Sequence, residues 1–213
     1  MTRQQLNVSV RRPPNSSLGN QMNQPIYTVK VTLRDIRPAI WRRLKVPADI
    51  ALFELHRVLQ AALGWTDSHL HQFVHRGTYY GPPDREFGMP TVSERRTRLG
   101  DLLHRLKDRL IYEYDFGDSW EHDVVLEGIS EAQPGMRYPR VIAGKRACPP
   151  EDVGGFPGYS EFLDAIRNPT HEEHESMLEW VGGHFDPEHF DVIAVNDRVP
   201  KRRASRRAAP NAR

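Results

Sequence analysis

The stretch LIYEYDFGDSWEHDVVLEG, residues 110–128, decides the fold. Apolar side chains occupy alternate positions in both of its halves, namely Leu110, Tyr112, Tyr114 and Phe116, then Trp120, Val124 and Leu126. This alternation is the period of a strand with one buried face, so we expect all of these residues in the core. Between the halves, Gly117 is expected to adopt a positive φ and Asp118 to bond nearby amides. The stretch therefore predicts an antiparallel hairpin.

His122 lies on the apolar face of this hairpin. A buried histidine needs a hydrogen-bond partner or stays neutral, because burying an unpaired charge is costly. Its expected partner is Asp118, Asp115 or a group from elsewhere in the chain. Asp118 and His122 are therefore candidate catalytic residues.

Two extended runs and a helix are predicted before the hairpin. Residues 26–33 alternate between apolar and polar, and a second extended run at 39–46 follows a short connection, which favours an antiparallel pair. A helix is expected next, with Asp49 as its N-cap and Gly64 at its C-terminal end. His56 lies near the apolar stripe of this helix and is interpreted as a structural histidine.

The other elements flank the hairpin. Residues 77–99 are rich in Gly, Pro and charge, which predicts a long surface loop, and a helical turn is expected at 100–106. A short extended piece is expected at 138–143. Three helices should follow, and their expected N-terminal caps are Ser160, Thr170 with Glu173, and Asp186.

These elements predict an α+β fold, with an antiparallel or mixed sheet, a ββα start, a central hairpin and a C-terminal cluster of helices. The single cysteine, Cys148, excludes an internal disulfide and fits a reducing compartment. No apolar run has the length of a membrane span, and the first residues lack the apolar core of a signal peptide. We therefore expect a soluble cytoplasmic protein without a membrane partner.

Charge divides the 213 residues into three parts. The net charge is +2, but residues 1–24 and 198–213 together hold ten basic residues and no acid, so residues 25–197 carry about −8. We expect a single domain at 25–197 between two disordered basic tails. The candidate nucleic-acid contacts in the C-terminal tail are Lys201, Arg202, Arg203, Arg206 and Arg207. The alternative is a tail that only improves solubility.

Histidines at alternate positions suggest a metal site. In the stretch SHLHQFVHRG, an extended chain places His69, His71 and His75 on one face. Neutral imidazoles are good ligands for divalent transition metals. The metal-ligand candidates are His69, His71, His122 and Cys148. The alternative is a polar outer face or a set of histidines hydrogen-bonded under a loop.

The segment ACPPEDVGGFPGY, residues 147–159, combines prolines, adjacent acids and paired glycines. Such a rigid turn presents Glu151 and Asp152 in a fixed way, which makes both candidate catalytic residues. Cys148 is a candidate ligand or reactive thiol, and a buried inert thiol is the alternative. The sequence contains no phosphate-binding glycine loop followed by Lys-Ser/Thr, no dinucleotide-binding glycine pattern and no nucleophile-elbow serine.

Four blocks together resemble one family. They are YTVKVTLRDIRPAIWRRLKVP, LHRVLQAALGW with SHLHQF, YEYDFGDSWEHDVVLE, and CPPEDVGGFPGYSEFLDAI. The chain is similar over residues 25–197 to the plasmid pRiA ORF-three-like family, bacterial proteins also found as passengers of insertion elements. The resemblance implies an α+β domain of unassigned biochemical function with a link to plasmids and mobile elements.

Two functional hypotheses follow. The first is a noncatalytic binding or accessory module that contacts nucleic acid or a protein partner, with the basic tails adding electrostatic attraction. The second is a metal-dependent enzyme of the hydrolase type with a divalent transition metal as cofactor. Its ligands and acid/base groups would come from His69, His71, Asp115, Asp118, His122, Cys148, Glu151 and Asp152.

Overall fold

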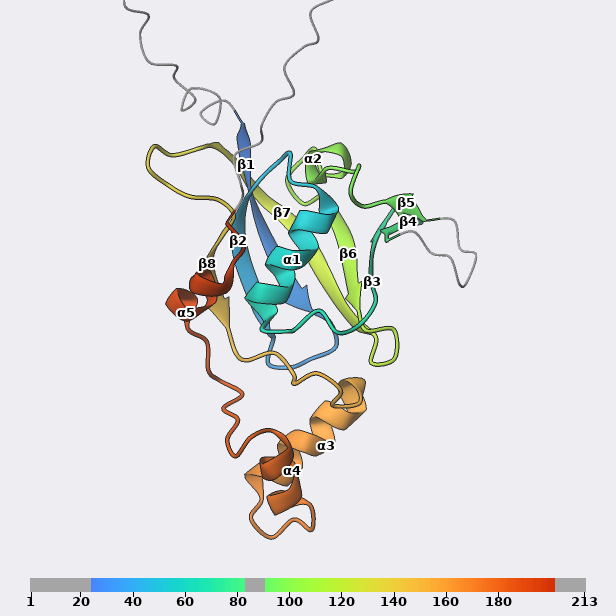
Figure 1. The fold of residues 1–213 in the computed structure, drawn as a ribbon, viewed down its shortest axis with the longest axis vertical. Coiled ribbons are helices and arrows are strands. Elements are labelled where there is room, and N and C mark those ends of the chain that lie inside the picture. Colours follow the sequence, from blue (N-terminus) through green and yellow to red (C-terminus); the bar gives the residue numbers. More distant parts are fainter. Residues whose placement is uncertain (1–23, 83–90, 202–213) are drawn as a thin grey trace, which may run out of the picture.

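The computed structural model describes residues 24–82 and 91–201. Within them lie eight strands: β1 (Pro25–Leu33), β2 (Trp41–Pro47), β3 (His71–His75), β4 (Thr78–Gly81), β5 (Val92–Ser93), β6 (Arg109–Tyr114), β7 (Trp120–Glu131) and β8 (Arg140–Lys145). The helices are α1 (Leu52–Leu63), α2 (Leu99–Leu102), α3 (Gly155–Arg167), α4 (His174–Trp180) and α5 (Val192–Arg198). The strands form one mixed sheet in the order β5-β4-β3-β6-β7-β1-β2-β8, which confirms the α+β prediction (Figure 1).

The predicted hairpin is the centre of this sheet. β6 and β7 pair antiparallel from Tyr114 opposite Trp120 to Arg109 opposite Val125. β7 also pairs with β1 along the full length of β1, while β6 pairs with β3. The hairpin therefore joins the two halves of the sheet, and its alternating apolar residues lie in the core as predicted, except Phe116.

The turn of the hairpin differs from the prediction in two ways. Phe116 is 45% exposed, and the positive φ angles belong to Asp115 (59°) and Ser119 (53°) rather than to Gly117. The left-handed conformation of Asp115 ends the alternation after Tyr114, so the next side chain points away from the core. Aspartate tolerates this conformation, and Asp115 Oδ1 accepts hydrogen bonds from the amides of Gly117 (3.0 Å) and Asp118 (3.3 Å).

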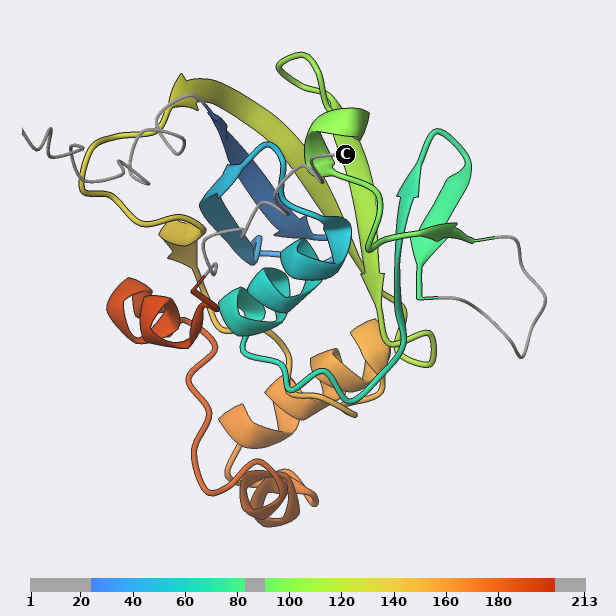
Figure 2. The same cartoon turned by 45° about the horizontal axis from the view of Figure 1, so that its top comes forward.

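Helix α1 lies across one face of the sheet (Figures 1 and 2). Gly64 ends it with a φ of 93°, as predicted. Its N-terminus differs, because the N-cap residue is Ala51 and not Asp49. Glu54 Oε2 accepts a hydrogen bond from the Ala51 amide (3.2 Å), so a carboxylate within the first turn replaces the predicted cap. On the opposite face of the sheet the side chains are half-exposed, for example Thr28, Lys30 and Thr32 of β1.

The C-terminal helices begin at other residues than predicted. α3 starts five residues before Ser160, because Gly154 and Gly155 adopt φ angles of 91° and 67° and turn the chain into the helix. α4 starts after Glu173 instead of Thr170, whose hydroxyl bonds the Asn168 side chain. α5 is capped by Asp191, whose side chain accepts from the amides of Ile193 and Ala194, and not by Asp186.

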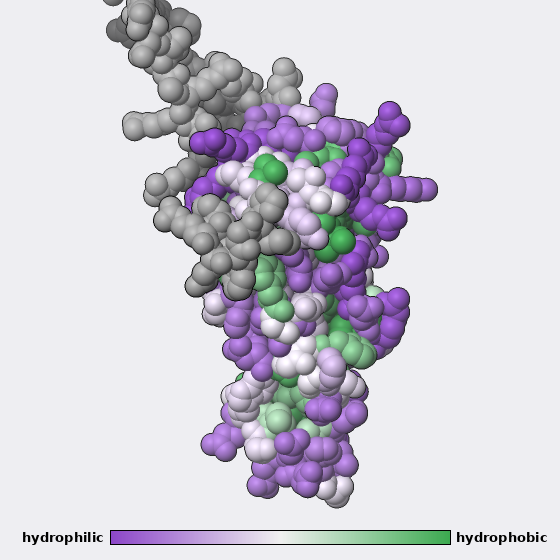
Figure 3. Space-filling view, turned by 90° about the vertical axis from the view of Figure 1, so that its right-hand side faces the viewer, coloured by the Kyte–Doolittle hydropathy of each residue, from purple (hydrophilic) through white to green (hydrophobic). Residues whose placement is uncertain are grey.

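These helices occupy two places. α5 packs against β8 and α1, whereas α3 and α4 form a lobe beyond one end of the sheet (Figure 1). Figure 3 shows a mainly hydrophilic side of the molecule, with apolar residues scattered over the part that contains the sheet and over this lobe. No helix in the described part of the chain is long and apolar enough to cross a membrane.

The segment 77–99 is more regular than predicted. β4 extends the sheet from β3, and β5 pairs parallel with β4. Residues 83–90 of this segment, and the two predicted tails apart from their innermost residues, lie outside the described residues.

A substitution at Gly158 tests how closely α3 packs against the preceding loop. A Cβ on Gly158 would lie 2.0 Å from the carbonyl oxygen of Val153, so the backbone must shift. We expect Gly158→Ala to lower the free energy of unfolding by at least about 2 kcal/mol, as overpacking against backbone does. Gly128→Ala is the control, since a Cβ there meets only ordinary contacts at 3.4 Å and beyond. Urea denaturation checks both, and equal stabilities would contradict the prediction.

Candidate functional site

Three segments singled out in the sequence meet at one end of the sheet. The indole Nε1 of Trp65 donates to the carbonyl oxygen of Pro149 (2.9 Å). The hydroxyl of Tyr114 donates to Glu151 Oε1 (2.5 Å), and the Gly154 amide donates to Asp118 Oδ2 (3.2 Å). The segment 65–69, the hairpin turn and the loop 148–154 are therefore parts of one site.

Glu151 ties these segments together. Its Oε2 accepts from the amide (3.1 Å) and the hydroxyl (2.5 Å) of Thr66, while Oε1 accepts from Tyr114. The Tyr114 oxygen in turn accepts from the amides of Ser68 (3.0 Å) and His69 (3.3 Å). Burial, and then the hydrogen bond to Glu151, raise the pKa of Tyr114, so it stays a protonated donor. Both oxygens of Glu151 are thus used in positioning the loop.

His69, Asp115 and Asp152 form a cluster beside this network. His69 Nε2 lies 3.1 Å from Asp152 Oδ1 and 3.7 Å from Asp115 Oδ2. This nitrogen is buried and makes no hydrogen bond of good geometry to the described residues. One ligand atom from each residue lies within 4.8 Å of the other two. A nitrogen and two carboxylate oxygens therefore lie close enough together to share one ion.

The spacing of these atoms suits a metal ion. Ligands of a tetrahedral zinc site lie 2.0–2.2 Å from the ion and hence about 3.3 Å from one another. The two separations from His69 Nε2 fall on either side of that value. The turn amides hold Asp115 Oδ1, which leaves Oδ2 directed at His69. The cluster can take one divalent cation.

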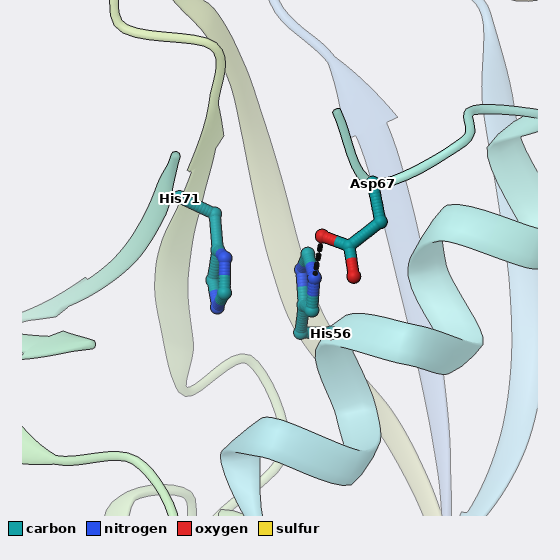
Figure 4. Close-up of side chains that lie close together, drawn as sticks. All are labelled: His56, Asp67 and His71. Carbon is teal, nitrogen blue, oxygen red and sulfur yellow. Dashed lines mark hydrogen bonds and ion pairs between the residues drawn. The ribbon is translucent and has the colours of Figure 1, made fainter. Parts of the chain in front are cut away.

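A second cluster lies in the core between α1 and β3 (Figure 4). The rings of His56 and His71 stack with centroids 3.4 Å apart and planes 4° from parallel. His56 Nε2 lies 2.7 Å from Asp67 Oδ1, and His71 Nε2 lies 2.8 Å from Glu94 Oε2. Each buried imidazole thus has its own carboxylate.

The polar atoms around His56 form a closed network. His56 Nδ1 lies 2.9 Å from the Tyr112 hydroxyl, which accepts from Gln60 Nε2 (2.9 Å), and Gln60 Oε1 accepts from the Asp67 amide (3.0 Å). Burial, and then the neighbouring His71, lower the pKa of His56 to about 4. His56 is therefore neutral near pH 7, with both ring nitrogens in hydrogen bonds. This geometry favours the structural interpretation, although His56, Asp67 and His71 have ligand atoms close enough for a metal.

The sequence missed the partners in this cluster. His69 and His71 were expected on one strand face, but β3 begins at His71, so the two histidines belong to different clusters. Asp67 and Glu94 lie in irregular segments, and Glu94 is 23 residues from His71. No local pattern marks either residue as a histidine partner, because Glu94 is buried by long-range packing and Asp67 is an exposed loop residue.

His122 lies apart from both clusters. It is fully buried, its Nδ1 donates to the Tyr112 carbonyl oxygen (3.2 Å), and its ring meets Trp65 edge-on. Burial lowers the pKa of His122 to about 4, so the ring is neutral at pH 7. Among the described contacts, no hydrogen bond or ion pair joins it to the expected partners Asp115 and Asp118. Asp118 instead holds the start of α3 through the Gly154 amide.

Cys148 is also in the core. Arg42 Nη2 lies 3.4 Å from its Sγ, and the other nitrogens of Arg42 donate to the carbonyl oxygens of Ala62, Trp41 and Lys145. Burial raises the pKa of the Cys148 thiol. The protonated thiol therefore packs near the guanidinium, away from His69 and its carboxylates.

Residues 25–194 match the model of the plasmid pRiA4b ORF-3-like protein family. The chain belongs to this family. The match includes all three segments that meet at the candidate site. It also confirms the resemblance carried by the DFGDSWEH and CPPEDVGG blocks.

The chain is also similar to two individual proteins. The chain is 44% identical over 172 residues to the uncharacterized protein y4hQ of Sinorhizobium fredii, covering 80% of this chain and 86% of the relative. It also resembles the crystal structure of MM3350, a protein of unknown function from Methanosarcina mazei, with a TM-score of 0.74 and 39% identity. That match covers 80% of this chain and 96% of the other. The description of neither protein states an activity.

The neutral state of His122 predicts acid sensitivity. Its folded pKa of about 4 lies below the unfolded value of 6.5, so stability is complete above pH 6.5 and falls as the pH drops toward 4. We expect His122 alone to remove roughly 3 kcal/mol across that window. Urea denaturation at pH 7 and pH 4.5 should show a smaller loss for His122→Leu than for the wild type. His104→Leu, at an exposed histidine, should keep the wild-type loss, and equal losses in all three proteins would contradict the prediction.

Proposed function

We propose that the protein is a metal-dependent enzyme of the hydrolase type, with a divalent transition metal held by His69, Asp115 and Asp152. The observation that carries the proposal is the buried Nε2 of His69, which lacks a good hydrogen bond and lies beside two carboxylate oxygens. Buried polar atoms almost always have partners, so an ion is a natural occupant.

The exposure of the three ligands favours catalytic over structural use of the metal. The Asp115 side chain is 11% exposed, whereas those of His69 and Asp152 are 28% and 70% exposed. Catalytic metal sites combine three protein ligands with an open position for water, while structural sites are closed by four. The metal would supply Lewis acidity and lower the pKa of a bound water.

The surrounding residues of this site act in positioning. Glu151 and Tyr114 fix the backbone on both sides of His69 and Asp152. Asp118 accepts a hydrogen bond from the Gly154 amide and so holds the glycine pair 154–155 at the end of the loop. Of the sequence candidates, His71, His122 and Cys148 lie in other surroundings and are not part of the proposed ligand set.

Nucleic-acid binding is the second candidate function. The basic residues at both ends of the chain and the resemblance to plasmid and mobile-element proteins motivate it, and so does a groove lined by Arg34, Arg76, Lys107 and Arg109. Lys201 is exposed, while Arg202, Arg203, Arg206 and Arg207 lie outside the described residues.

Metal binding tests the first proposal directly. We expect untagged protein, titrated calorimetrically with Zn²⁺, Mn²⁺ and Ni²⁺, to bind one ion per chain. His69→Ala and Asp115→Asn should each weaken that binding by at least about 100-fold, since even outer-shell changes cost 10–100-fold. His75→Ala is the matched control, because His75 bonds the Arg109 carbonyl oxygen at the far end of β3. Folded wild-type protein that binds none of the three ions would refute the proposal, as would unchanged affinity in His69→Ala.

A further inference from the structure

A groove of ≈ 440 Å³ lies on the sheet face opposite α1. Its floor includes Val74 and Ile111, which pair across β3 and β6 and alternate with the buried Phe73 and Tyr112. Its walls come from the β3–β4 turn, the turn before β6 and the end of β1. The groove is therefore built on the regular part of the sheet.

The lining of this groove is strongly basic. It contains Arg34, Arg76, Lys107 and Arg109 against a single acid, Asp108, in a domain whose net charge is negative. Asp108 Oδ2 accepts from the amides of His104 (2.8 Å) and Arg105 (2.9 Å). These amides take up the hydrogen-bonding capacity of that oxygen and lower the pKa of Asp108.

Three of the four cations form no ion pair with the described residues, although Arg76 is close enough to Asp108 to help lower its pKa. Arg34 bonds Glu121 and Asp123, so its charge is balanced within the fold. Arg76, Lys107 and Arg109 are exposed, and no ion pair to them is found in the described part of the chain. Arg76, Lys107 and Arg109 gather around one carboxylate, that of Asp108, and so leave an excess of positive charge that an anionic ligand would balance.

The backbone presents these cations in fixed positions. Arg76 and Lys107 adopt φ angles of 50° and 75° in tight turns, and the Lys107 amide donates to the Leu126 carbonyl oxygen (2.8 Å). Arg109 is the first residue of β6 and pairs with Val125. Two separate segments, the β3–β4 turn and residues 107–109, thus direct positive charge to one groove.

We propose that this groove binds the phosphodiester backbone of nucleic acid. Several cations from different segments match a chain of repeated negative charges, and phosphate contacts of this kind dominate nucleic-acid affinity. The groove is distinct from the metal cluster, because Arg109 begins β6 and Asp115 follows its other end, about 20 Å away at 3.3 Å per residue. The inference therefore does not depend on the proposed metal site.

Fluorescence anisotropy with a labelled single-stranded 20-mer and the full chain tests this site. The variant Arg76→Asn/Lys107→Asn/Arg109→Gln removes the three charges, and asparagine tolerates the positive φ at the first two positions. At 50 mM salt we expect it to bind at least about tenfold more weakly than the wild type. The slope of log K against log[salt] should be shallower by about 2, because each lost phosphate contact of a single strand accounts for about 0.7.

The matched control neutralises three exposed arginines outside the groove, Arg57→Gln/Arg96→Gln/Arg167→Gln. It makes the same change in net charge and keeps the basic ends of the chain, so it should bind nearly as the wild type does. Equal weakening in the two triple variants would assign binding to overall charge and overturn the proposal. Absence of wild-type binding at 50 mM salt, or inorganic phosphate binding as tightly as the 20-mer, would also overturn it.

Discussion

The carboxylate of Glu151 is the interaction on which the candidate site depends. One of its oxygens accepts from Tyr114 at the end of β6, and the other accepts twice from Thr66 after α1. Hydrogen bonds to a charged acceptor are the strong ones, so this residue holds the loop 148–154 against two other segments. Asp152 follows Glu151 by one residue and is therefore held near His69, where neither the hairpin nor the helix alone would place a second carboxylate.

The hairpin turn supplies the other half of the site by leaving the strand conformation. The left-handed backbone of Asp115 sends Phe116 into solvent and lets Asp115 bond the turn amides with one oxygen while the other faces His69. At the opposite end of β6, the chain presents arginine and lysine. One strand thus separates a cluster suited to a cation from a groove suited to an anion, and opposite charges placed this far apart are largely screened from each other.

Burial assigns different roles to histidines that look alike in the sequence. His69 precedes β3 and stays partly exposed, whereas His71, two residues later, enters the core and stacks on His56. His122 alternates with apolar residues and is buried without a carboxylate, which lowers its pKa and keeps it neutral. Of these three histidines, His69 is the one with a ring nitrogen that lacks a hydrogen bond to the described residues and lies beside two carboxylates.

The sequence by itself determined strands β1, β2, β6 and β7, the central hairpin and the end of α1, but not β4 and β5. The apolar residues of β1, β6 and β7 alternate with polar ones, and Gly64 stands where the chain turns left-handed. Both features depend on local conformation, which neighbouring residues in the sequence largely fix. Only the tertiary structure decided that the helices start away from Asp49, Ser160 and Asp186, and that Phe116 lies outside the core. It also decided that Glu94 pairs with His71, and that Glu151 is used for positioning while Asp152 faces His69. These outcomes depend on contacts between residues far apart in the chain. The sequence alone could not select the helix caps, because several nearby polar residues can each serve as an N-cap.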